Sequence, residues 1–190
     1  MALTDGTILL PALLAGVLVL LSHVPLGIQV LRRGIIFVDL AVAQAAATGM
    51  LLVRHWLGRE GFWWAQGGAL LAAIGCVLML HRLERLGPRI QEALIGGTFV
   101  VLASLGVLLL ASDPHGGQHF SSTLSGQILW VDQRQLWALG LAAAIALVCL
   151  RSFRHPLPGF YLPFSLAITA SVQAVGVFVV FASLIFPALA

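Results

Sequence analysis

The sequence has no lysine and very little charge of either sign. Only 9% of its 190 residues are charged, whereas an average soluble domain has roughly 25%. Its ten basic residues are all arginines, and 60% of the chain is hydrophobic. This composition excludes an ordinary soluble domain. Together with a mean hydropathy of +1.03, it predicts a protein that crosses a membrane several times.

Several other features are missing, and each absence excludes a class of protein. There is no glycine-rich phosphate loop, no G-x-S-x-G and no paired-cysteine zinc motif, so we expect no enzyme activity and any ATP hydrolysis needs another chain. The two cysteines, Cys76 and Cys149, lie inside apolar runs and are interpreted as packing residues. The N-terminus has no basic segment, which argues against a cleaved signal peptide.

The apolar runs are continuous and long, which is typical of transmembrane helices and not of the short alternating strands of a β-barrel. The sequence therefore predicts an all-α, polytopic transmembrane bundle with about six spans, forming one domain over residues 1–190. The predicted spans are 7–31, 34–53, 62–80, 93–111, 135–150 and 160–189, with the fifth starting at 135 or earlier, near 128.

The arginines predict the orientation of these spans. Seven lie in the connections after spans one, three and five, and three lie on the opposite side. Positive residues favour the cytoplasmic side, so the first set is predicted to be cytoplasmic and the N-terminus outside. The high isoelectric point therefore reflects topology, and we expect no nucleic-acid binding. The first set is Arg32, Arg33, Arg82, Arg85, Arg89, Arg151 and Arg154; the second is Arg54, Arg59 and Arg134.

The second span carries the most informative acid of the chain. In residues 34–53, Asp39 is the one ionisable residue, and Gln44 follows it among alanines. An ionised group at that depth costs at least about 2.5–3.5 kcal/mol on insertion scales, so it needs a partner or water. Alanines and Gly49 allow other helices to approach closely. We interpret this run as a helix inside a bundle, with Asp39 facing a pathway.

The first span contains a break signal at residues 22–27, where Pro25 and Gly27 follow His23. Proline removes a backbone hydrogen bond, and a break inside a membrane is tolerated where it lines protein or water. His23 at this position is either a metal or proton site, or a polar side chain that binds carbonyl groups freed by the break.

The last span carries a polar stripe. At spacings of 4, 4, 3, 7 and 4 residues, its members fall within about 80° of one helical face. The stripe is either a polar seam between helices or the wall of a pathway, and both interpretations place it inside the bundle. Its members are Ser165, Thr169, Gln173, Gly176, Ser183 and Pro187.

Two connections have alternative interpretations. The segment 81–92, with Arg85, Arg89 and Glu92, is a solvated connector or a docking surface for a cytoplasmic partner. The segment 112–119 holds two histidines and an aspartate, and is a flexible loop or a transient metal station near the entrance. The segment 120–131 could form a re-entrant or interfacial helix.

The order of these motifs resembles the permease subunits of bacterial zinc/manganese-type ABC importers. The motifs that carry this resemblance are, in chain order, the broken first span, Arg32-Arg33-Gly34, Asp39, and the stretches 91–96, 124–129 and 174–190. The resemblance implies a multi-pass inner-membrane protein that works as a homodimer with a cytoplasmic ATPase and a periplasmic metal-binding protein. It implies a transported Zn, Mn or Fe ion and no permanently bound cofactor. Asp39 would pass the ion, with His23 and Gln44 as second-rank ligands.

Three departures from the family pattern affect these expectations. The family commonly has a histidine four residues after the aspartate, but Ala43 occupies that position, and Gln44 is rotated about 140° from Asp39. Oxygen ligands alone weakly favour Mn or Fe over Zn. The segment 151–159 is short for an ATPase-docking segment, so docking is expected partly on Arg85, Arg89 and Glu92. The family usually continues for further spans, so the chain is expected to be truncated or abbreviated.

Two other classes of function stay open on the sequence. One is a membrane scaffold or regulatory subunit without a pathway, favoured by the missing histidine. The other is a proton-coupled secondary transporter that uses Asp39 as its proton site. Copurification with an ATPase would favour the importer.

Overall fold

The computed structural model describes residues 2–58, 61–111, 126 and 128–190, with the side chains of 2–8 and 88 left aside. Within these ranges the chain is helical and has no strand. The long helices are α1 (Ala2–Arg33), α2 (Val38–Leu57), α3 (Phe62–Leu83), α4 (Pro88–Leu110) and α6 (Gln133–Ser152), followed by α7 (Leu162–Val175) and α8 (Val177–Leu189). The short turns are η1 (Glu84–Leu86), η2 (Ile128–Trp130) and η3 (Leu157–Tyr161).

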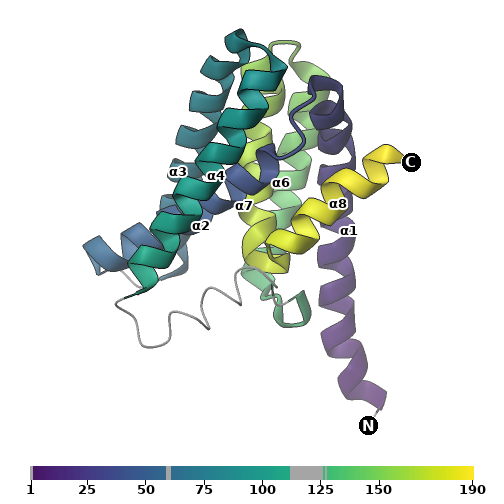
Figure 1. Ribbon diagram of the computed structural model, residues 1–190. Coiled ribbons are helices and arrows are strands. Elements are labelled where there is room, and N and C mark those ends of the chain that lie inside the picture. The colour runs from purple at the N-terminus through teal and green to yellow at the C-terminus, as the bar shows by residue number, and fades with distance from the viewer. Residues whose placement is uncertain (1, 59–60, 112–125, 127) are drawn as a thin grey trace.

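The helices form one bundle in which α2, α3 and α4 stand on one side and α1 and α8 on the other, with α6 and α7 between them (Figure 1). α2 packs on α3 and α4, whereas α1 packs on α8 and α6. The run of α2 from Val38 to Gly49 is buried. Small residues make this possible, because Gly49 lies directly against the backbone of Gly68 in α3.

Four helical stretches of the described chain are long and apolar enough to cross a membrane: Leu9–Arg33, Phe62–Leu86, Arg89–Leu110 and Gln133–Ser152. They correspond to predicted spans one, three, four and five. α2 is not among these four stretches, and it carries Asp39 and Gln44 and ends on Arg54 and His55. The all-α membrane bundle predicted from the sequence is confirmed, and the boundaries of its first five spans lie within about five residues of the predicted ones.

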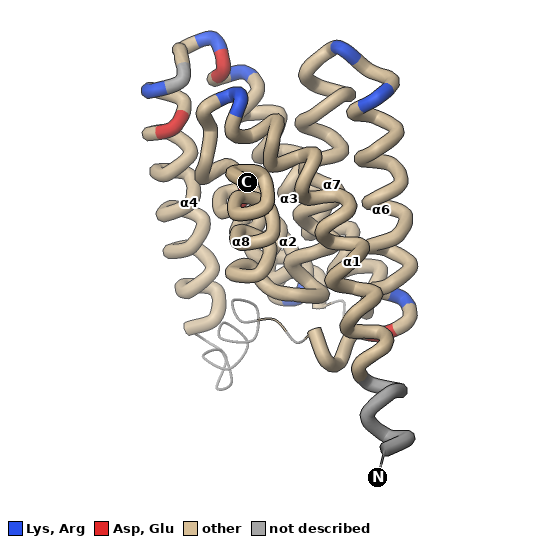
Figure 2. The backbone as a smooth tube through the Cα atoms, turned by 90° about the vertical axis from the view of Figure 1, so that its right-hand side faces the viewer, with Lys and Arg blue, Asp and Glu red and all other residues tan. Residues whose placement is uncertain are grey.

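The described arginines lie at the two ends of the bundle that the predicted alternation of the spans assigns to them. Figure 2 shows the basic residues of the connections α1–α2, α3–α4 and α6–α7 gathered at one end of the bundle. We call this the arginine-rich end. Arg54 and Arg134 lie at the opposite end, and Arg59 is outside the described residues. The positive-inside rule assigns the arginine-rich end to the cytoplasm.

The predicted interruption of the first span is wrong. α1 is one helix through Pro25. Packing explains its continuity, because Gly27 lies directly against the Leu184 carbonyl group of α8, and a helix held along its length keeps its course despite one missing hydrogen bond. Ser22 also donates to the carbonyl oxygen of Val19, at 2.9 Å.

The sixth predicted span is also wrong, because it contains a break that was not predicted and consists of two helices, α7 and α8. α7 ends at Val175, and Gly176 adopts φ 81° and ψ 165° before α8 begins. Only glycine adopts this conformation readily. The predicted stripe is therefore continuous only from Ser165 to Gln173, and Ser183 and Pro187 belong to a separate helix.

The fifth span begins at Gln133 and not near residue 128. Asp132 caps the helix, since its side chain accepts a hydrogen bond from the Gln133 N–H at 2.7 Å, while Gln135 accepts one from the Asp132 N–H at 2.9 Å. This reciprocal cap fixes the start of α6. Ile128–Trp130 forms a separate turn, and most of the predicted 120–131 helix lies outside the described residues.

Candidate functional site

Asp39 lies in the first turn of α2 and is 0% exposed. Neither of its carboxylate oxygens has a well-formed hydrogen bond to a described residue. The groups that act most on its charge are the backbone N–H groups of Leu40 and of Asp39 itself, at the start of α2. The α2 helix starts beside α8, where the Phe37 ring stacks on Phe181 with 6.4 Å between the centroids. A buried acid without a partner is costly in an apolar interior, so this position is suited to a group that is completed by a cation or a proton.

Glu92 of α4 holds the start of α2. Its Oε1 atom accepts a hydrogen bond from the Phe37 N–H at 3.1 Å, and its Oε2 atom is buried without a partner. The charge of Glu92 also acts on the Asp39 carboxylate. A second negative charge near Asp39 makes this region more attractive to a cation. Sequence reasoning assigned Glu92 to ATPase docking, yet the contact that the structure gives it is internal.

His23 is also 0% exposed, and its two ring nitrogens have different environments. Nδ1 lies 2.9 Å from the carbonyl oxygen of Val19 and 3.0 Å from the hydroxyl of Ser22. Because a carbonyl can only accept, the neutral ring carries its proton on Nδ1 and presents a lone pair on Nε2. Nε2 is buried without a partner in the described chain. The backbone contact thus prepares Nε2 as a ligand or proton acceptor.

Gln44 is 5% exposed and lies at the contact between α2 and α4. Its Nε2 atom is close to Gly106, since a Cβ placed there would be 3.3 Å away. One turn on, Thr48 donates to the carbonyl oxygen of Leu102 at 3.1 Å. Gln44 therefore serves helix packing in this structure. This placement agrees with the rotation of about 140° that separates it from Asp39 along a helix.

The polar residues of α7 do not all have the same environment. Ser165 donates within its own helix to the carbonyl oxygen of Leu162, at 2.8 Å. Thr169 is 0% exposed and its hydroxyl has no partner among the described residues. Gln173 lines a cavity of about 350 Å³ at the end of the bundle opposite the arginines. Ser171, 1% exposed and without a described partner, was not singled out in the sequence.

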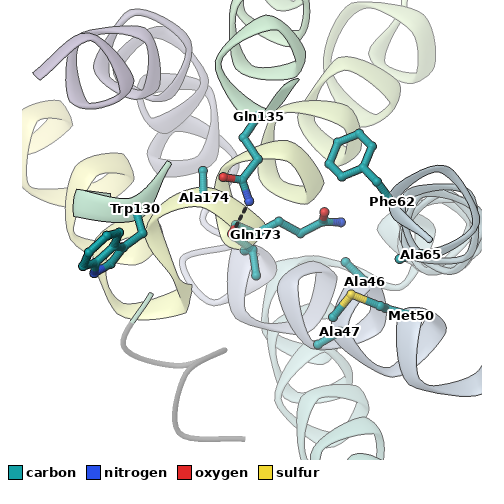
Figure 3. Close-up of a pocket in the computed structure, with 10 residues that line it drawn as sticks. Ala46, Ala47, Met50, Phe62, Ala65, Trp130, Gln135, Gln173 and Ala174 are labelled. Carbon is teal, nitrogen blue, oxygen red and sulfur yellow. Dashed lines mark hydrogen bonds between the residues drawn. The ribbon is translucent and has the colours of Figure 1, made fainter. Parts of the chain in front are cut away.

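The cavity brings together the ends of α2, α3, α6 and α7 (Figure 3). Three of its polar or aromatic members were not singled out as site residues in the sequence: Phe62, Trp130 and Gln135. Phe62 and Gln135 were read as the starts of spans three and five. Trp63 and Trp64, next to Phe62, are exposed, as is typical of aromatic residues at a membrane interface. The capping-box spacing of Asp132 and Gln135 indicated the start of α6 but gave no sign that Gln135 also contacts α7.

The described residues contain no group of three or more His, Cys, Asp or Glu side chains arranged to hold a metal ion. Asp39 and His23 thus belong to no such group within the described chain, and Gln44 points to Gly106 at the contact of α2 with α4. The predicted loop station at His115 and His119 lies outside the described residues. Cys76 and Cys149 are free thiols. The polar groups available to an ion are single and dispersed, as suits passage more than storage.

Arg85 and Arg89, predicted to dock an ATPase, are exposed at the arginine-rich end. Arg85 lies within η1, which connects α3 to α4, and Arg89 lies in the first turn of α4. Glu84 of η1 is paired with Arg33. Gln91 is buried, and it donates to the Leu80 carbonyl oxygen at 3.2 Å and to the Tyr161 hydroxyl at 3.3 Å. The connection is thus anchored on its inner side and presents its arginines outward.

A helical bundle with several apolar spans, buried unpaired polar groups and a cavity at one end defines the class of multi-pass membrane transport proteins. The comparison with protein families shows which family within this class the chain belongs to. The chain matches the ABC 3 transport family over residues 5–163, and it belongs to that family. It is thus the membrane component of an ABC-type transport system.

Among solved structures, the chain is similar to PsaBC from Streptococcus pneumoniae in complex with Fab. The TM-score is 0.66 with 23% sequence identity, and the alignment covers 96% of this chain and 73% of that chain. At this identity the likeness concerns the fold. No curated protein matches the chain.

Proposed function

We propose that this protein is the permease subunit of an ABC importer that moves divalent metal ions across the bacterial inner membrane. A separate cytoplasmic ATPase drives it, a periplasmic metal-binding protein delivers the ion, and two permease copies work together. The family supports the transport role. The observation that carries the metal assignment is Asp39, a fully buried carboxylate without a described partner in the core of the bundle.

Asp39 is the group proposed to attract and pass the ion. A divalent cation satisfies an unpaired carboxylate, and the nearby charge of Glu92 adds to the attraction. His23 offers one free ring nitrogen, and Thr169 one unpaired hydroxyl. Carboxylate and hydroxyl oxygens are better ligands for Mn or Fe than for a metal that prefers thiolate ligands. Because these ligands are few, they hold an ion weakly, and the ion can leave quickly.

The test is manganese uptake by cells or proteoliposomes that contain the permease with its ATPase. Asp39→Asn removes the charge and keeps the shape, and we expect uptake to fall by roughly tenfold or more, equivalent to about 1.4 kcal/mol of lost ion stabilisation. Asp132→Asn is the matched control. Asp132 is an exposed carboxylate that caps α6, and asparagine caps equally well, so uptake should persist.

Three results would contradict the proposal. Normal manganese uptake by Asp39→Asn, with the ATPase still bound, would remove Asp39 from the pathway. Transport that runs on a proton gradient without nucleotide would favour a secondary transporter, in which Asp39 carries a proton. A chain that binds no ATPase and transports nothing would favour the scaffold alternative.

A further inference from the structure

The described residues that line the cavity opposite the arginine-rich end are all neutral. The cavity volume is about 350 Å³, and the lining combines amide, thioether and aromatic groups with small apolar residues. Among these described residues no side chain carries a positive charge that would repel a cation. The lining residues are Ala46, Ala47, Met50, Phe62, Ala65, Trp130, Gln135, Val172, Gln173 and Ala174.

The C-terminal end of α7 borders this cavity. Val172, Gln173 and Ala174, in the last turn of α7, belong to the lining, whereas no residue of α8 does. The chain turns at Gly176, whose N–H donates to the Val172 carbonyl oxygen at 3.0 Å. The carbonyl end of a helix carries partial negative charge, and broken helices in transporters use such ends to attract cations.

Gln135 braces this helix end. Its Nε2 atom donates to the Gln173 carbonyl oxygen at 3.4 Å, and its Oε1 atom accepts from the Asp132 N–H at 2.9 Å. Both ends of the Gln135 amide are therefore engaged by the protein. α6 and α7 are held together at this point, and the position of the last turn of α7 is fixed.

Unlike the Gln135 amide, the side-chain amide of Gln173 makes no hydrogen bond to a described residue. It extends from α7 into the cavity, toward Met50, Phe62 and Ala65 (Figure 3). Its Nε2 atom has no partner among the described residues, and no hydrogen bond holds the amide in one orientation. An amide that no hydrogen bond fixes is able to present its oxygen to a cation, and amide oxygens are suitable ligands for hard divalent ions.

We propose that this cavity is an entry station for a hydrated divalent cation, which the Gln173 amide oxygen and the carbonyl end of α7 hold before the ion reaches Asp39. The inference rests on the proposed function. The cavity is much larger than a bare ion, with room for on the order of ten waters, so the ion keeps most of its hydration shell. Neutral ligands make the binding weak, as suits a step of a pathway.

The experiment measures whether Mn²⁺ protects a thiol placed in the cavity. Cys76 and Cys149 are replaced by alanine in the full transporter, and Ala65→Cys introduces a reporter in the lining. A membrane-impermeant thiol reagent is then added to intact cells, with and without Mn²⁺. Ala72→Cys is the matched control. It lies on the same helix but lines a separate apolar hollow of about 230 Å³ between α2, α3 and α4.

We expect Ala65→Cys to be labelled from outside and Mn²⁺ to slow this labelling several-fold, with no Mn²⁺ effect on Ala72→Cys. Gln173→Leu should abolish the protection, while its backbone contact with Gln135 is kept. A reporter that is not labelled, labelling that Mn²⁺ does not slow, or protection that survives Gln173→Leu overturns the entry station. Manganese uptake by the same cells separates the two proposals, because uptake without protection contradicts this inference alone.

Discussion

Arg33, the last residue of α1, forms an ion pair with Glu84, the first residue of η1, with 2.9 Å between Nη1 and Oε1. Glu84 also lies 3.1 Å from Nδ1 of His81 in α3. The guanidinium carbon of Arg33 is 4.7 Å from the centroid of the Phe160 ring in η3. One arginine therefore connects the end of α1 to both other connections at the arginine-rich end. A movement imposed on η1 by a docked partner would reach α1 and η3 through this contact.

The first prediction concerns the strength of this pair. The side chains of Arg33 and Glu84 are 24% and 35% exposed, so solvent screens them and their coupling should be about 0.5–1 kcal/mol. Arg33→Ala alone should cost more, about 1–2 kcal/mol, because it also removes the contact with Phe160. A double-mutant cycle of unfolding free energies in detergent, with Glu84→Gln, measures both. A coupling free energy of zero would show that the pair does not stabilise the contact between α1 and η1.

The second prediction concerns the crossing of α1 and α8. A Cβ on Gly27 would clash with the carbonyl oxygen of Leu184 and lie 3.0 Å from the Cβ of Ala188. Gly27→Ala should therefore destabilise the protein by roughly 1–3 kcal/mol, because backbone must move. Gly16→Ala in the same helix has open space around it and should be neutral or slightly stabilising. Thermal unfolding of both variants in detergent checks this. Equal stabilities would mean that the two helices separate easily at Gly27.

The third prediction concerns the break between α7 and α8. Gly176 has φ 81° and ψ 165°, and a side chain in this region costs roughly 1–3 kcal/mol. Gly176→Ala should lower the unfolding temperature and reduce uptake, since it also displaces the last turn of α7. Gly97→Ala in α4 is the control, because it lies in regular helix with open space around it. An unchanged unfolding temperature for Gly176→Ala would indicate that the break is not fixed.

The fourth prediction concerns the ATPase contact. Arg85 and Arg89 are exposed in η1 and in the first turn of α4, and this connection is anchored to the bundle. Reversing both charges, Arg85→Glu and Arg89→Glu, should reduce the amount of ATPase that copurifies with the permease, because complementary charges set the rate and specificity of docking. The same reversal at Arg151, in the last turn of α6, and Arg154, just after it, is the comparison and should reduce copurification less. Loss of the ATPase only with the second pair would place docking on the short segment 151–159.

The sequence predicted most of the helices and the burial of Asp39 well, because both depend on local composition. An apolar run of about 20 residues has few alternatives in a membrane, and a single aspartate within it must face the interior. Asp39 and Thr169 are accordingly fully buried. The arginines likewise lie at the ends where the alternation of spans placed them.

The sequence could not predict features that depend on which helix lies next to which. Pro25 and Gly27 signalled a break, yet α1 stays continuous where it packs against Leu184 of α8. Gly176 was read only as a member of the polar stripe, yet the chain does turn there, where Gly126 contacts the Val175 carbonyl group. A glycine permits a turn, but the neighbouring backbone decides whether the turn forms.

The sequence by itself thus determined the class of protein, most of the helices, the end at which the described arginines gather and the burial of Asp39, since hydropathy and charge act locally on each segment. Only the tertiary structure decided that Glu92 holds the start of α2, that Gln135 braces the end of α7 and that Gln173 reaches into a cavity. These contacts join residues distant along the chain, and their energies exist only once the helices have packed.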